Sequence, residues 1–304
     1  MWLLFALAGP VLWAASTHID KYLVERYFRD SDTAVLMVFT ALTGILLLPP
    51  IAYYEAGVFH TPARDISVMI ASGACYMAAM LFYLRAIQSE EASVVAPLFQ
   101  TSTLFTYLFA YVFLGEVLTA TEIGGAVLIV AGALLISLDI SARARGLKLR
   151  LVATMLACTG TLAMASVIFK FFAVRERFWV TTFWTSVGDV LFGLGIVAIP
   201  AYRRQLVELL RRSAGPMLAI NGANELINLG GGLGVRYALL MAPVAVVSAV
   251  SSTTTLFVFL FGILLTRFFP MLGREDLSWR NLVQKAAAAV LIAIGVALID
   301  RPDA

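Results

Sequence analysis

The chain has 304 residues, of which 61% are hydrophobic and only 13% are charged, and its mean hydropathy is +0.90. Soluble domains carry about 25% charged residues, so this composition excludes most water-soluble folds. A helix needs about 20 apolar residues to cross the hydrocarbon core of a bilayer, and the apolar residues suffice for roughly ten such spans. We therefore expect an all-α integral membrane protein surrounded by the lipid bilayer.

Charge and rare residues argue against several other classes of protein. The 22 basic and 19 acidic residues leave a net charge of only +3, and the basic ones lie in short loops, which does not favour nucleic-acid binding. Cys75 and Cys158 lie inside apolar runs, and the only histidines are His18 and His60. We expect neither a metal site nor a cofactor. The apolar start has no basic segment before it, which favours a retained first span over a cleaved signal peptide.

Apolar runs and their breakers predict ten membrane-spanning helices. Pro49 and Pro50 are expected to close the second span, Pro200 the seventh, and Pro216 to open the eighth. A basic connector at 141–150 separates a first half, 1–140, from a second half, 151–304. In chain order, the predicted spans are 2–19, 33–54, 66–88, 93–114, 121–139, 151–172, 180–200, 216–238, 244–268 and 282–299.

An internal repeat relates the two halves. Residues 86–105 align with 238–257 at an offset of 152, with identities that include Val94-Val95 on Val246-Val247 and Thr103-Leu104-Phe105 on Thr255-Leu256-Phe257. An offset of 149 places Lys21 on Lys170 and Gly44 on Gly193, and Gly132 lies over Gly295. Because each half has an odd number of spans, the second half must be inverted in the membrane. Two inverted five-helix repeats are typical of secondary transporters, which bind substrate near the midplane.

The residues of the first half resemble an EamA-type unit of the ten-helix drug/metabolite transporter superfamily. The resemblance depends on Trp13 followed by Lys21, on 83–87, on 94–98, on Gly115-Glu116 and on the glycines at 124–132. The second half resembles a diverged copy, through 237–239, Pro243, 246–248 and Gly295, but has Arg267-Phe268 where the first has Gly115-Glu116. The resemblance implies a transporter, often an exporter of amino acids or other small metabolites, in a bacterial or archaeal inner membrane.

Four polar residues share one face of the eighth predicted span. Asn221, Asn224, Glu225 and Asn228 are spaced i, i+3, i+4 and i+7. Such a stripe is too costly to face lipid, so we expect it to face inward, toward Gln100 or Trp13. It either lines a substrate cavity, which we favour, or forms a hydrogen-bonded seam between helices. The glycines at 230–234 that follow favour close approach of a neighbouring helix over a hinge.

Other candidates for the substrate cavity or for ion coupling lie elsewhere in the chain. Asp189 lies midway along the seventh span, and it either takes part in transport or pairs with a hydroxyl of the bundle. Glu225 and Asp189 are the candidates for carrying a coupling proton, because a carboxyl in a medium of low dielectric constant can exchange protons near neutral pH. Gln100 on the fourth span and Trp13 on the first are candidate cavity residues. We expect Asp20 nearer the membrane interface.

These patterns predict a multi-pass secondary transporter of small metabolites in the cell (inner) membrane, an exporter for which proton coupling is a candidate mechanism. We do not expect an enzyme, because no Gly-x-Ser-Gly motif is present and Ser186-Val187-Gly188-Asp189 departs from the Gly-x-Gly-Asp of intramembrane aspartyl proteases. Aspartate-rich motifs for diphosphate chemistry are absent from the sequence as well. A membrane-embedded enzyme, or a structural or channel-like bundle, is the alternative.

Overall fold

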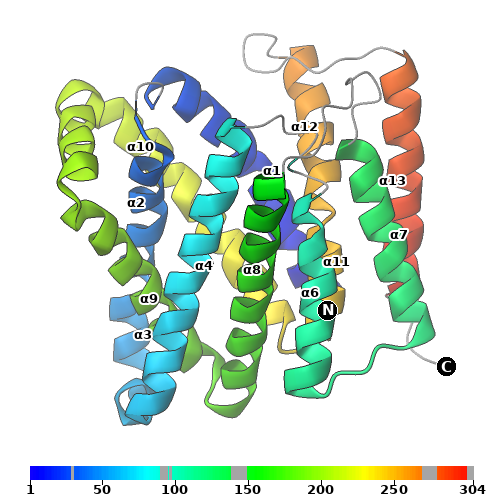
Figure 1. The fold of residues 1–304 in the computed structure, drawn as a ribbon, viewed down its shortest axis with the longest axis horizontal. Helices are drawn as coiled ribbons and strands as arrows, with labels where there is room; N and C mark the ends of the chain where they lie inside the picture. The colour runs from blue at the N-terminus through cyan, green and yellow to red at the C-terminus, as the bar shows by residue number, and fades with distance from the viewer. Residues whose placement is uncertain (29–30, 90–94, 96–97, 138–148, 269–278, 300–304) are drawn as a thin grey trace.

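The computed structural model describes residues 1–28, 31–89, 95, 98–137, 149–268 and 279–299, and every regular element among them is helical (Figure 1). The helices are α1 (Trp2–Arg26), α2 (Thr33–Thr43), η1 (Gly44–Leu46), α3 (Leu48–Tyr54), η2 (Ala56–His60), α4 (Ala63–Ser89), α6 (Thr101–Phe109), the π-helical turn η3 (Ala110–Leu114), α7 (Ala120–Ser137), α8 (Leu149–Arg175), α9 (Phe178–Ala198), α10 (Pro200–Ala238), α11 (Val244–Ser251), α12 (Thr254–Phe268) and α13 (Trp279–Ile299).

Seven helical segments in the described ranges are long and apolar enough to cross a membrane. They are Trp2–Leu23, Thr33–Tyr54, Ala63–Ala86, Leu149–Arg175, Phe178–Ala198, Val244–Phe268 and Leu282–Ile299. Two shorter apolar segments, Thr101–Leu114 and Ala120–Leu135, match the predicted fourth and fifth spans. The predicted eighth span is the second half of the 39-residue α10, which is not among these apolar segments. The predicted connector at 141–150 lies outside the described residues, except for its last two, which begin α8.

The prolines correct two of the predicted boundaries. Pro49 and Pro50 do not close the second span but occupy the first turn of α3. Pro200 follows the end of α9 at Ala198, as predicted, and begins α10, whereas Pro216 lies inside α10 instead of opening it. Pro49 and Pro50 are tolerated because a proline fits the first turn of a helix, where its missing N–H would have no intrahelical partner. Inside a helix, a proline removes one hydrogen bond without necessarily ending the helix.

The helices pack in pairs that join the two halves of the sequence. α4 packs against α8 and α9, while α10 packs against α1 and α2. α6 contacts α8, α12 contacts α1, and α7 lies beside α13 at the right edge of Figure 1. In that view α6 runs downward, whereas the chain rises through α11 into α12. The repeated segments on α6 and on α11–α12 therefore run in opposite senses.

Glycines allow two of these helix pairs to approach closely. A Cβ on Gly73 of α4 would meet the Thr185 carbonyl of α9, and a Cβ on Gly188 would meet the Ile70 carbonyl of α4. On α10, a Cβ on Gly231 would lie 3.0 Å from the indole nitrogen of Trp13 on α1. The close helix approach predicted for the glycines at 230–234 is therefore confirmed, and α1 is the neighbour. This approach brings the polar side chains of α1 and α10 within hydrogen-bonding distance of each other.

Candidate functional site

The polar stripe of α10 lies inside the protein. Asn221, Asn224 and Glu225 are 2%, 0% and 3% exposed, and Asn228 is half-buried. Leu226, on the opposite side of the same helical turns, is 56% exposed. A helix with one polar buried face and one apolar exposed face matches a bundle in lipid, where the polar groups must find partners within the protein.

One partner of the stripe is Asp20 on α1. Asn224 Nδ2 donates a hydrogen bond of 2.7 Å to Asp20 Oδ1, and Ser16 Oγ donates to Asp20 Oδ2 at 3.4 Å. Sequence reasoning expected Asp20 nearer the membrane interface and did not pair it with the stripe. The sequence does contain a pattern that indicates this face of α1. Trp13, Ser16 and Asp20 are spaced i, i+3 and i+7, so they lie on one side of the helix.

The other partner is Thr40 on α2, whose Oγ1 donates a hydrogen bond of 2.8 Å to Glu225 Oε1. Asn228 also hydrogen-bonds the Glu225 carboxyl group. We call the set formed by Asp20, Thr40, Asn221, Asn224, Glu225 and Asn228 the α10 polar cluster. It joins three helices through carboxylates, amides and one hydroxyl.

Trp13 borders the α10 polar cluster. Its indole nitrogen lies against Gly231, three residues beyond Asn228 on α10, as the close approach of α1 to this glycine shows. The indole is half-buried. An aromatic ring at this position can pack against a solute held by the cluster, or it can simply fill the groove between α1 and α10.

Asp189 is buried and forms an ion pair with Arg236 of α10, with 3.7 Å between Asp189 Oδ2 and the guanidinium. The guanidinium also lies 5.3 Å from the centre of the Phe169 ring. Sequence reasoning considered a hydroxyl partner for Asp189 and missed Arg236. Asp189 is therefore separate from the α10 polar cluster and its negative charge is compensated, although its Oδ1 has no hydrogen-bond partner among the described residues.

Gln100 is 6% exposed and accepts a hydrogen bond of 2.7 Å from Ser252 Oγ. These two residues are separated by the repeat offset of 152. Close by, the hydroxyls of Thr103 and Ser248 lie 3.3 Å apart. Among the described residues, hydrogen bonds connect Gln100 to this junction between the fourth and ninth predicted spans. The polar stripe of α10, which was expected to face Gln100 or Trp13, is not hydrogen-bonded to Gln100 in the described structure.

The Gly115-Glu116 pair anchors the end of η3 to the start of α11. Gly115 adopts a left-handed backbone, with φ of 67°, which ends the helix. Glu116 Oε2 then accepts a hydrogen bond of 2.8 Å from the Val244 N–H, and its Oε1 lies 2.5 Å from Lys170 Nζ. Lys170 also donates a bond of 2.7 Å to the Ala242 carbonyl. This arrangement gives Glu116 a structural role at a helix end.

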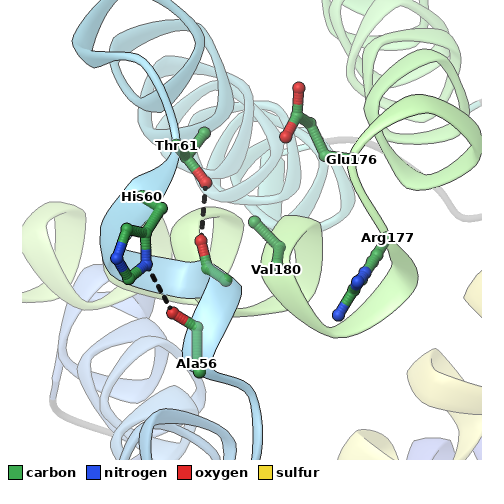
Figure 2. Close-up of a pocket in the computed structure, with 7 residues that line it drawn as sticks. Ala56, His60, Thr61, Glu176, Arg177 and Val180 are labelled. Atoms are coloured by element: carbon green, nitrogen blue, oxygen red, sulfur yellow. Dashed lines mark hydrogen bonds between the residues drawn. The ribbon is translucent and has the colours of Figure 1, made fainter.

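Two cavities in the described structure lie away from all the predicted candidates. The first, shown in Figure 2, has a volume of about 410 Å³ and lies among η2 and the adjoining ends of α8 and α9. Its His60 and Thr61 side chains bond the Ala56 and Gly57 carbonyls, at 2.9 and 3.3 Å. The second, of about 560 Å³, is a mainly apolar space between α4 and α8. Across the described residues, no group of three or more His, Cys, Asp and Glu is arranged to hold a metal ion.

Comparison with known proteins identifies the first part of the chain. Residues 1–138 match the EamA-like transporter family. The matched segment is 138 of the 304 residues and corresponds to the predicted first half of the chain. This match bears out the resemblance of the first half to the drug/metabolite transporter superfamily, and together with the seven apolar helices it supports a multi-pass membrane transporter. A match to a transporter family agrees with the expectation that the chain is not an enzyme.

One solved crystal structure, described only as that of a protein, shares the fold. It covers 98% of this chain and 96% of its own, with a TM-score of 0.69 and 16% sequence identity. At that identity the match extends the fold assignment over nearly the full length and says nothing about substrate. No curated protein matches the sequence.

Proposed function

We propose that the protein is a secondary transporter that exports small organic solutes, such as amino-acid-like metabolites, across the cell (inner) membrane in exchange for protons. The observation that carries this proposal is the α10 polar cluster. It places two carboxylates and three amides where α1, α2 and α10 meet, inside a chain with apolar membrane-crossing helices. Intramembrane carboxylates are costly, and they mark proton and substrate pathways in transporters.

The proposal includes ten spans arranged as two inverted halves, 1–140 and 151–304, joined by the connector at 141–150. The packing supports it, because three contacts between the halves have exchanged counterparts. The pair α4–α8 corresponds to α10–α1, α4–α9 to α10–α2, and α6–α8 to α12–α1. The hydrogen bond between Gln100 and Ser252 joins equivalent positions, as expected near a pseudo-two-fold axis in the membrane plane.

In the mechanism we propose, Glu225 carries the coupling proton. Its partners, Thr40 and Asn228, can serve either protonation state, because a hydroxyl and an amide both donate and accept hydrogen bonds. Asp189 is the second choice, since Arg236 stabilises its ionised form. Rocking of one half against the other would then expose the cluster alternately to the two sides.

Reconstitution into proteoliposomes tests this proposal. Candidate solutes are screened for transport with and without an imposed pH gradient, first with the parent protein. Glu225→Gln should abolish accumulation driven by the gradient but preserve solute exchange, because it keeps the shape and removes the titration. Asp189→Asn should retain gradient-driven accumulation. If both variants remain proton-driven, the carboxylates are structural, and if the parent moves no solute against a protein-free control, the transporter proposal fails.

A further inference from the structure

The carboxylates of this protein differ in how their charge is compensated. Among the described residues, Asp189 pairs with Arg236 and Glu116 with Lys170. Nearer the surface, Glu55 pairs with Arg177 and Asp32 with Arg85. The two carboxylates of the α10 polar cluster form no such pair in the described structure, and their hydrogen-bond donors are neutral amides and hydroxyls. A buried carboxylate without a cation is costly in its ionised form, so the deprotonated cluster lacks a compensating positive charge.

The amides of the same cluster leave hydrogen-bond acceptors unused. Oδ1 of Asn221 and Oδ1 of Asn224 are buried and have no partner in the described structure, although the two side chains are only 2% and 0% exposed. The Asn224 amide is fixed in orientation, because its Nδ2 must donate to the Asp20 carboxylate. Buried polar atoms are nearly always paired, so two unpaired acceptors beside two uncompensated carboxylates indicate a missing donor that carries positive charge.

We propose that the α10 polar cluster binds a primary ammonium group, so that the transported solutes are organic amines. An ammonium group supplies one positive charge and three N–H donors, which match the carboxylates of Asp20 and Glu225 and the free amide oxygens. This inference rests on the proposed function at one point, where the solute that binds is taken to be the solute that is transported. The cluster has no described basic side chain that would pair with a solute carboxylate, so it binds the ammonium end of an amino-acid-like solute and disfavours purely anionic solutes.

Calorimetric titration of the purified full chain in detergent tests this inference with four probes of similar size. Butylamine, protonated at neutral pH, should bind saturably, whereas butanol and butyrate should not. Tetramethylammonium carries the charge without N–H donors, so it should bind at least about tenfold more weakly than butylamine. Equal binding of butylamine and butanol, or of butylamine and tetramethylammonium, would overturn the proposal. This series needs no variant and is decisive even if the variants do not fold.

Variants locate the site. Glu225→Gln and Asp20→Asn should each weaken butylamine binding at least about tenfold, while Asp65→Asn, in the first turn of α4, should bind as the parent does. Unchanged binding in both cluster variants, with folding verified by circular dichroism, would contradict the assignment. NaCl and KCl are titrated as well. If NaCl binds saturably and abolishes butylamine binding while KCl does neither, the cluster is assigned to an inorganic cation instead. Binding is measured in detergent, without a membrane. A failure of the amine proposal is therefore distinguishable from a failure of the protein to transport solutes.

Discussion

Lys170→Met should destabilise the fold by about 3 kcal/mol, because Lys170 joins segments that are far apart in the sequence. Its ammonium group pairs with Glu116 at 2.5 Å and donates to the Ala242 carbonyl at 2.7 Å. Glu116 in turn accepts from the Val244 N–H, so these contacts hold the end of η3 against the start of α11. The variant removes both interactions of the ammonium group while a methionine fills much of its space.

The magnitude follows from the burial of the pair. The Lys170 and Glu116 side chains are 14% and 16% exposed, so water screens their interaction weakly. Hydrogen bonds to charged groups contribute about 1.5–3 kcal/mol, so losing the Ala242 bond costs about 2 kcal/mol and the undercompensated Glu116 adds about 1 kcal/mol. Glu116→Gln keeps an acceptor for Val244 and should cost about 1.5 kcal/mol. The double variant should cost about as much as Lys170→Met alone, which gives a coupling energy of about 1.5 kcal/mol.

Reversible unfolding in mixed micelles of mild detergent and sodium dodecyl sulfate, followed by circular dichroism, measures these differences. Lys21→Met is the matched control, since Lys21 is the exposed counterpart of Lys170 in the first half and should change the free energy of unfolding by less than about 0.5 kcal/mol. If the costs of the two single variants simply add in the double variant, Lys170 and Glu116 do not act as a pair.

Three further predictions concern helix packing and buried pairs. Gly73→Ala should lower the free energy of unfolding by about 1–3 kcal/mol, because the new Cβ would meet the backbone of α9. Gly195→Ala places its Cβ in open space and should leave the free energy of unfolding unchanged. Equal effects of the two variants would contradict the close approach of α4 and α9. Arg236→Gln should lower the free energy of unfolding by about 3 kcal/mol, because it leaves the charge of Asp189 uncompensated. Adding Asp189→Asn should recover at least half of that loss. No recovery would mean that the two residues are not coupled. Gln100→Ala should lower the free energy of unfolding by about 1–2 kcal/mol, because Ser252 Oγ loses its acceptor, and should leave solute affinity per folded molecule unchanged. Weakened affinity would place Gln100 on the solute path.

The sequence was sufficient to predict the burial of the α10 stripe. Asn221, Asn224 and Glu225 repeat at helical spacing, and lipid offers such groups no hydrogen bonds, so only an inward orientation is affordable. The partners of the stripe were not predictable in the same way. Asp20 and Thr40 lie about 200 residues earlier in the chain, and local periodicity says which face of a helix is polar but not which helix it meets.

The same limit explains the other differences between prediction and structure. Asp189 was singled out as a costly intramembrane carboxylate, but its compensation by Arg236 depends on how α9 packs against α10. Pro216 is a helix breaker by local propensity, and tertiary context overrides that propensity within α10. The glycines were more informative, since small residues clustered on one helix have few uses other than close packing.

The central claim is that the α10 stripe lines a path opened alternately to each side of the membrane. The most direct test is Asn221→Cys in a background in which Cys75 and Cys158 are replaced by serine, with the protein oriented in sealed vesicles. A membrane-impermeant thiol reagent should modify the new cysteine from either side, and bound solute should slow the modification. Modification from neither side, in a folded protein, would show that the stripe is a sealed hydrogen-bonded seam and would contradict the account.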